Sequence, residues 1–141
     1  MDALPDLARR GGGPAPRLAS EAEVLAEMEY PPLLAQMEGA PPVLIAQGQA
    51  ELAHRPCVAL VGARNASAAA CRFARGLAAD LAARGVVVVS GLARGIDTQA
   101  HLGALAGGTI GVIASGIDIS YPPENTELQR EVGKSGLVMT E

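Results

Sequence analysis

The sequence predicts an α/β fold built on a parallel β-sheet, and three observations carry that prediction. Residues 57–141 alternate between apolar runs with strand character and segments with helical spacing. The run Val86–Val89 consists of four valines, and an unalternating β-branched run is typical of a strand buried on both faces. Each complete strand candidate leads into a turn that contains glycine and then into a helix. Repeated strand–helix units favour right-handed crossovers, so we expect a Rossmann-like parallel sheet with helices on both faces.

The N-terminal part of the chain is expected to be a short, partly helical region. Residues 1–29 have the composition of a linker or of the remnant of an N-terminal helical region, and Gly11–Pro16 is typical of a linker. Within them, Ser20 and Glu23 have the spacing of a capping box, which favours a short helix over residues 20–28. Residues 30–56 then form an approach segment, with a helical turn near Leu33–Met37 and a short strand at Val43–Ala46.

Residues 57–141 are expected to form the main domain. The predicted strands are Cys57–Val61, Val86–Val89, Thr109–Ala114 and a fourth that begins at Gly136, and the predicted helices are Ser67–Arg84, Ile96–Ala106 and one from Pro123 to about Lys134. In the first helix, Phe73, Leu77 and Leu81 form one apolar ridge, with Ala70, Ala74 and Ala78 beside it.

The turn Ser90–Asp97 is the strongest candidate for a binding site, because it follows the buried valine strand directly. Open α/β sheets bind ligands at the carboxyl ends of their strands. Gly91 and Gly95 allow a ligand to approach the backbone, and the N–H groups of the following helix favour an anion. Arg94 adds a permanent positive charge of fork geometry. The simpler interpretation is a tight turn whose Ser90 and glycines serve packing alone.

Two further loops, Gly62–Ser67 and Ser115–Pro122, should open on the same edge of the sheet as Ser90–Asp97. Arg64 is placed to contact a phosphate, although it could equally be an ordinary surface arginine. Tyr121 could stack on a nucleic-acid base or pack against the prolines beside it. Three convergent turns that contain glycine favour a binding site over simple packing.

Other polar residues have simpler explanations. Asp97 and His101 are four residues apart, which predicts a structural pair on one helix face more readily than an acid and an imidazole at a pocket rim. Ser67 is predicted to cap its helix rather than to act as a nucleophile. Neither a G-x-G-x-x-G motif after the first strand nor a P-loop is present, and no metal-ligand cluster is recognised, so we expect no cofactor and no metal.

Composition limits the classes of function. The 141 residues suffice for one domain, and the net charge of −4 resides in residues 1–56, because residues 57–141 balance seven basic against seven acidic side chains. Nucleic-acid binders usually carry a basic excess, so any anion site here must be local. No apolar run is long enough to span a membrane and no signal peptide is evident, so we expect a cytoplasmic protein with Cys57 and Cys71 reduced.

With these residues in view, the sequence resembles the DNA-processing protein A family (DprA, also called Smf). The segments that carry the resemblance are Val61–Ser67, Val88–Asp97, Ala100-His101, Gly103–Leu105, Thr109-Ile110, Gly116–Asp118 and Tyr121-Pro122, with Tyr30–Leu34 and Ala40–Leu44 upstream. The run Ser90–Asp97 is the most specific of them.

The resemblance implies a cytoplasmic recombination mediator without catalytic turnover. Such a protein binds and protects single-stranded DNA, helps to load the RecA recombinase during natural transformation, and forms a homodimer without contact to membranes. The implied DNA-binding pocket consists of Gly62, Ala63, Arg64, Ser90, Gly91, Arg94, Gly95, Gly116 and Tyr121. Ala63 replaces the serine of the family's Gly-Ser-Arg motif, which removes one hydroxyl contact.

The family's domain continues with further strands, basic residues and a dimer surface. We therefore expect residues 57–141 to be a Rossmann-like DNA-binding domain that is truncated on its C-terminal side. Two alternatives remain at this point. One is a nucleotide or phosphoribosyl hydrolase of the lysine-decarboxylase-like Rossmann group, although Gly107-Gly108-Thr109 lacks the glutamate of that group's glycine-rich turn. The other is a fragment that binds only protein partners.

Overall fold

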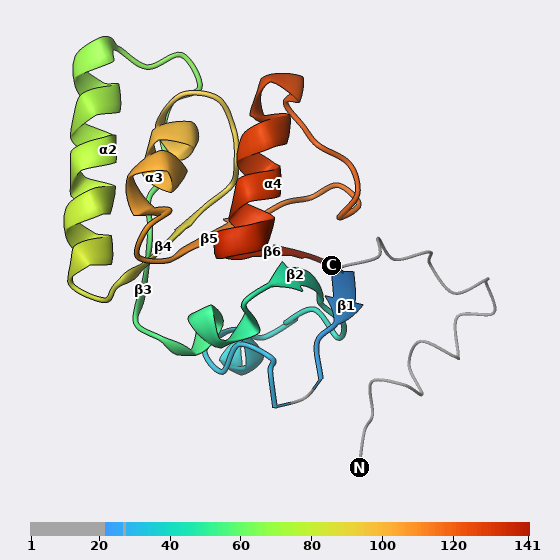
Figure 1. Cartoon of the computed structure of the whole chain (residues 1–141). Helices are drawn as coiled ribbons and strands as arrows, with labels where there is room; N and C mark the ends of the chain where they lie inside the picture. The colour runs from blue at the N-terminus through green and yellow to red at the C-terminus, as the bar shows by residue number, and fades with distance from the viewer. Residues whose placement is uncertain (1–21, 27) are drawn as a thin grey trace.

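The computed structural model of the chain describes residues 22–26 and 28–141, which form a six-stranded sheet with helices packed on it (Figure 1). The strands are β1 (Ala22–Val24), β2 (Ile45–Gly48), β3 (Cys57–Ala59), β4 (Val87–Ser90), β5 (Thr109–Val112) and β6 (Leu137–Thr140). The α-helices are α2 (Ala68–Ala83), α3 (Ile96–Ala104) and α4 (Thr126–Ser135), and the 3₁₀ helices are η1 (Leu34–Gln36), η2 (Ala50–His54) and η3 (Pro123–Asn125).

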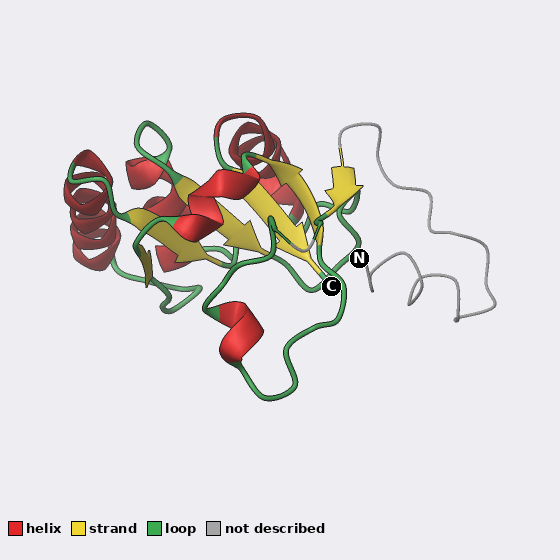
Figure 2. Ribbon diagram, turned by 90° about the horizontal axis from the view of Figure 1, so that it is seen from below, coloured by secondary structure: helices red, strands yellow, loops and turns green. Residues whose placement is uncertain are grey.

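Strands β3, β4, β5 and β6 are parallel and lie side by side in chain order, which confirms the predicted Rossmann-like sheet. Val58 pairs with Val88 and Val89 with Ile110, so the valine run occupies the middle of the parallel sheet. When right-handed crossovers connect parallel strands that follow one another in the same direction across the sheet, their helices all lie on the same face of the sheet. Accordingly α2, α3 and α4 share one face, and the short η1 and η2 lie on the other (Figures 1 and 2).

The N-terminal segment joins the same sheet, which differs from the prediction. Strand β2 pairs antiparallel with β6, and β1 pairs antiparallel with β2. The helix predicted over residues 20–28 is therefore wrong where the structure describes it, because Ala22–Val24 forms β1. The alanine, glutamate and leucine residues of this segment favour a helix, but tertiary contacts override the propensity of so short a segment, and here the open edge of β2 supplies backbone partners. The rest of the predicted linker, up to residue 21, lies outside the described residues.

The two faces of the sheet have separate hydrophobic cores. On the face of η1 and η2, the core includes Val87, Ile110, Leu137, Leu25, Leu44 and Leu52. On the α-helical face, Val88 packs with the alanines Ala78, Ala82, Ala100 and Ala104. No helix within residues 22–26 and 28–141 combines the length and apolar character needed to cross a membrane.

Helix α2 faces the core with its alanines and not with its large side chains. Phe73 is 71% exposed and Leu77 is 36% exposed, whereas Ala78 is fully buried. The cause is the close approach of α2 and α3, since a side chain at Gly103 would collide with the carbonyl oxygen of Arg75. Only small residues fit at this contact, so Phe73 and Leu77 of the predicted apolar ridge are left on the outer flank of α2, whereas Leu81 packs against the core.

Candidate functional site

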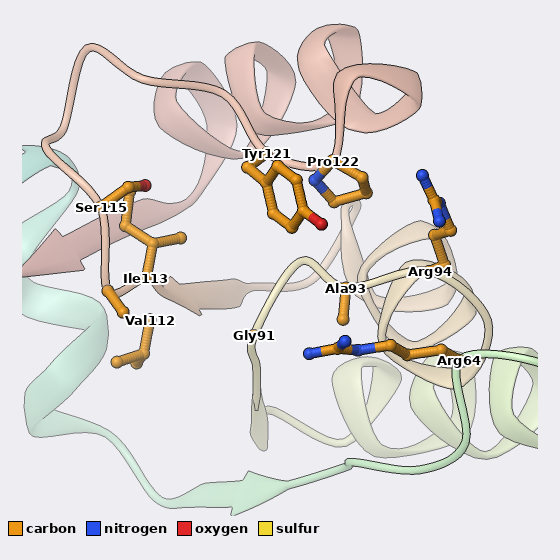
Figure 3. A pocket seen from close by; sticks show the side chains of 10 residues that line it. Arg64, Gly91, Ala93, Arg94, Val112, Ile113, Ser115, Tyr121 and Pro122 are labelled. Carbon is orange, nitrogen blue, oxygen red and sulfur yellow. The ribbon is translucent and has the colours of Figure 1, made fainter.

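The three predicted loops meet at the carboxyl edge of the parallel strands and line one cavity of about 480 Å³. The lining residues are Arg64, Gly91, Ala93, Arg94, Val112, Ile113, Ala114, Ser115, Tyr121 and Pro122 (Figure 3). The cavity has one basic side and one largely apolar side. The prediction that the loops converge on one edge of the sheet is confirmed.

The two arginines of the cavity are in different states. The Arg64 side chain extends across the cavity, whereas the guanidinium of Arg94 is turned away from it (Figure 3). Within the described residues, Arg64 has neither a hydrogen bond nor an ion pair. Arg94 makes a bidentate ion pair with Glu124, with Nε–Oε2 at 2.7 Å and Nη2–Oε1 at 3.2 Å. Arg64 and Arg94 therefore do not face each other as two unpaired cations.

The ion pair also changes the pKa values of its two partners. The hydrogen bond from Arg94 lowers the pKa of the Glu124 carboxyl, and the carboxylate in turn raises the pKa of Arg94. Both groups stay charged over the neutral range, so their charges compensate each other at the rim of the cavity. Both side chains are more than half exposed, and solvent screens the pair.

Asp97 occupies the position in which an external anion was expected. Its Oδ2 accepts a hydrogen bond from the Gly91 N–H at 3.1 Å, and its Oδ1 accepts a longer one from the Gly62 N–H at 3.4 Å. The side chain is buried and joins two loops that follow different strands. The backbone N–H groups predicted to hold a phosphate are thus partly occupied by the protein's own carboxylate.

His101 supports the same turn from beneath. Its Nε2 accepts a hydrogen bond from the Leu92 N–H at 3.2 Å, and Leu92 has the left-handed backbone conformation, with φ of 58°. Its Nδ1 lies 2.8 Å from the Thr109 hydroxyl, which itself donates to the Val88 carbonyl. We therefore assign the hydrogen to Nδ1. Burial lowers the pKa of His101 to about 4, so the ring is neutral at pH 7.

Asp97 and His101 are structural, as predicted, but the reason differs from the predicted pair. Each side chain bonds to backbone groups of the turn, and no direct hydrogen bond joins the two within the described residues. The spacing of four residues places one carboxylate and one imidazole under the same turn, where each satisfies a different N–H group.

Asn125 connects the third loop to the second. Its amide Nδ2 lies 2.8 Å from the Leu92 carbonyl, 3.3 Å from the Ala93 carbonyl and 2.8 Å from the Thr98 hydroxyl. Asn125 ends η3 and is buried, so these contacts fix the start of α4 against the Ser90–Asp97 turn. Sequence inspection missed this residue, because an asparagine in a turn before a helix resembles an ordinary cap.

Gly95 allows the first two loops to touch. Its φ of 77° is in the region that favours glycine, and a side chain there would collide with the carbonyl oxygens of Ala63 and Arg64. The Ile96 N–H also donates to the Ala63 carbonyl at 3.2 Å. Arg64 is therefore positioned by a backbone contact between the loops.

The predicted site residues divide into two groups. Arg64, Gly91, Arg94 and Tyr121 line the cavity. The others belong to the framework of the cavity. Gly62 and Ala63 of the first loop contact the second loop, and Gly95 is the second-loop residue that lies against Ala63. The buried Ser90 hydroxyl donates to the Leu60 carbonyl at 2.6 Å, and the Gly116 carbonyl accepts from the Ile119 N–H at 2.9 Å.

The apolar wall of the cavity was not predicted as part of the site. It comprises Val112, Ile113 and Ala114 at the end of β5, together with Pro122. Tyr121 is 66% exposed at the cavity rim, and Val112 is 47% exposed. The signal that could have identified this wall is the position of residues 112–114 at the carboxyl end of a predicted strand. Among the described residues that line the cavity, none is a carboxylate or a histidine.

The arrangement has the chemistry of a binding site. It offers one unpaired cation, a rim tyrosine and an apolar wall, a combination that suits a ligand with an anionic part and a flat apolar part. Within residues 22–26 and 28–141, His, Cys, Asp and Glu side chains form no group of three that could hold a metal ion.

The chain is similar in sequence and in fold to known proteins. Residues 22–141 match the model of the family "DNA recombination-mediator protein A". A DNA processing protein DprA of Streptococcus pneumoniae is 40% identical over 114 residues, which cover 79% of this chain and 40% of that protein. A protein Smf of Synechocystis is 38% identical over 121 residues, which cover 80% of this chain and 30% of that protein. The chain thus spans well under half the length of these relatives.

Two solved structures have the same fold. The crystal structure of the S. pneumoniae DNA processing protein A superposes with a TM-score of 0.78 and 36% identity, covering 86% of this chain and 44% of that one. A DNA processing protein A of Helicobacter pylori, whose single-stranded DNA binding mode was studied structurally, superposes with a TM-score of 0.79 and 29% identity, covering 85% of this chain and 55% of that one.

Proposed function

The chain belongs to the DNA recombination-mediator protein A family, and on that premise we propose that residues 57–141 bind single-stranded DNA through the three-loop cavity. The observation that carries the proposal is the unpaired Arg64 guanidinium, which extends over a cavity that also has an apolar wall. In this proposal the protein acts as a recombination mediator that protects incoming DNA, helps to load RecA and works as a homodimer.

The phosphate contact is assigned to Arg64. Its guanidinium can donate two parallel hydrogen bonds to phosphate oxygens, and within the described residues no carboxylate competes for it. The backbone of Gly91 approaches the same cavity without a side chain in the way. Because Asp97 already uses the Gly91 N–H, the affinity for phosphate depends on the arginine more than on backbone donors.

The base contact is assigned to Tyr121 and the wall formed by Val112 and Ile113. An exposed aromatic ring beside an apolar surface offers a stacking position that every base can use. Phosphate contacts carry no information about base identity, and stacking carries little. The proposed binding is therefore weakly sequence-dependent and favours single strands, whose bases are accessible.

The hydrolase alternative has no observation in its favour. Cleavage of a glycosidic or phosphoester bond needs an acid or a base near the reacting atoms, and the described lining of the cavity contains no histidine or carboxylate. Incubation of the protein with nucleoside monophosphates should accordingly release no free base. Release of base at a rate proportional to protein concentration would favour the enzyme over the binding protein.

The decisive experiment is a salt titration of binding to a fluorescent oligothymidylate of about 20 nucleotides, longer than one expected site. Arg64→Ala should weaken binding and reduce the slope of log K against log salt by about 0.7, the value for one lost phosphate contact on a single strand. Arg130→Ala is the matched control, since it removes an equally exposed charge that is paired with Glu127 outside the cavity. Equal behaviour of the two variants, or preference for duplex over single strand, would contradict the proposal.

A further inference from the structure

Arg94 and Glu124 are placed opposite each other by the fold and not by chance contact of two surface side chains. Each lies one residue from a position that Asn125 fixes, because Asn125 follows Glu124 directly and its amide bonds to the carbonyl of Ala93, which precedes Arg94. A second bond from Asn125 holds the Leu92 carbonyl at 2.8 Å. The backbones that carry the two charges therefore keep a constant separation, and the bidentate geometry of the pair follows.

The ion pair determines how many cations the cavity presents. The ionic side chains in the described lining are Arg64 and Arg94. With Glu124 bound to Arg94 through both carboxylate oxygens, the Nε and Nη2 donors of Arg94 are occupied and its charge is compensated. Figure 3 shows the consequence, with only the Arg64 guanidinium extended into the cavity. Glu124 itself is not among the residues that line the cavity.

We propose that Glu124 is a residue that limits DNA affinity, because it holds Arg94 out of the phosphate site and leaves Arg64 as the working cation. This inference rests on the proposed function, since it concerns the cation count of the same cavity. A site with one unpaired guanidinium holds a single phosphodiester charge and releases it readily. A site with two would bind more tightly and with a steeper dependence on salt.

The test is Glu124→Gln in the whole chain, assayed by the same oligothymidylate salt titration. Glutamine keeps the size of the side chain and removes the charge, so Arg94 becomes available to a second phosphate oxygen. Binding should become severalfold tighter, and the slope of log K against log salt should steepen by about 0.7. Glu127→Gln is the matched control, because it removes the same charge one turn away, from a pair with Arg130 that lies outside the cavity. The control should bind like wild type.

Two arginine variants complete the design. Arg94→Ala in the wild-type background leaves the Glu124 carboxylate uncompensated at the rim of the cavity, so it should weaken binding by repelling the phosphate. Arg94→Ala combined with Glu124→Gln removes both members of the compensated pair, so it should return the tight variant to the wild-type affinity and slope. The inference is overturned if Glu124→Gln and Glu127→Gln behave alike, or if the double variant binds as tightly as Glu124→Gln alone, because the gain would then not come from Arg94. Absence of any single-stranded DNA binding by the wild type would instead refute the proposed function, so the two failures are distinguishable.

Discussion

The loops Gly62–Ser67 and Ser90–Asp97 lie against each other at the mouth of one cavity, yet they are built in opposite ways. In Ser90–Asp97, backbone groups are bound by the buried side chains of Asp97, His101 and Asn125. In Gly62–Ser67, residues 62–65 are exposed and Arg64 makes no polar contact within the described residues. The loop with the more specific sequence is internally bonded, and the plainer loop presents Arg64, the cation that we propose binds phosphate.

This difference shows that a distinctive motif can be required for the backbone geometry of a loop, apart from any contact with a ligand. The carboxylate of Asp97 takes N–H groups that a bound phosphate would otherwise use. The motif around it is demanding because a left-handed Leu92 and a positive φ at Gly95 must both be held in place. Its specificity reflects backbone geometry, whereas the single arginine of the other loop needs only to be exposed and correctly anchored.

The largest effect on stability is expected at Gly95, where the two loops touch. Gly95→Ala should lower the free energy of unfolding by about 4 kcal/mol, because a Cβ adds backbone strain and collides with two carbonyl oxygens. Urea denaturation of the variant and of Gly76→Ala gives the comparison. Gly76 lies in α2 with open space around it, so its replacement should stabilise the protein by up to about 1 kcal/mol. Equal effects at both glycines would show that the loops do not depend on close contact.

The contacts of His101 beneath the Ser90–Asp97 loop should also make the stability of the protein depend on pH, whereas within the described residues the Gly62–Ser67 loop has no corresponding contact with a histidine. The folded protein keeps His101 neutral down to a pKa of about 4, whereas the unfolded chain protonates it near 6.5. The unfolded state therefore binds more protons between these values, and stability should fall by about 3 kcal/mol as the pH falls from about 6.5 to about 4. Denaturation midpoints across this range measure the effect. His101→Gln should remove this component of the pH dependence. An NMR signal that is assigned to His101 by its loss in that variant, and that titrates near 6.5 in the folded protein, would contradict the prediction.

Loss of the link to the third loop should have an intermediate effect. Asn125→Ala leaves the buried Leu92 carbonyl without its partner, so the free energy of unfolding should fall by about 2 kcal/mol. Asn65→Ala, at an exposed position of the Gly62–Ser67 loop, should change it by less than about 0.5 kcal/mol. Thermal unfolding of both variants measures the two losses of stability. Similar losses would mean that side-chain contacts stabilise the two loops equally.

A small effect on stability is also expected at Arg64, the proposed phosphate-binding cation. Arg64→Ala should change the free energy of unfolding by less than about 0.5 kcal/mol, because the side chain is exposed and unpaired within the described residues. The same variant should lose affinity for single-stranded DNA, so stability and binding separate at this position. A large loss of stability would mean that Arg64 supports the fold and would weaken its assignment as a ligand contact.

Much of the fold was predictable because local pattern and tertiary role agree. The run Val86–Val89 predicts a buried strand, and β4 covers Val87–Ser90, one residue further along the chain. Strand–helix alternation places three turns on one edge of the sheet. Prediction failed where the partner is remote in sequence. The strand Ala22–Val24 depends on β2, and the outward position of Phe73 depends on how closely α3 approaches α2.

The candidate site was predictable to a similar extent. Arg64, Gly91, Arg94 and Tyr121 follow from their positions after strands, because that rule needs only the order of the elements. The state of each arginine does not follow from it. Whether Arg94 is paired depends on Glu124, which is thirty residues away and belongs to another loop.

Strand β3 has a practical consequence for handling the protein. It is the last strand at one edge of the sheet, all three of its residues are exposed, and Cys57–Val61 carries no charged side chain. Native sheets usually protect such an edge with a lysine, a proline or a bulge, since unpaired backbone groups recruit strands from other molecules. Concentrated solutions of this chain should therefore scatter light over time. A lysine introduced at Val58, which is 40% exposed, should suppress that turbidity without entering the three-loop cavity.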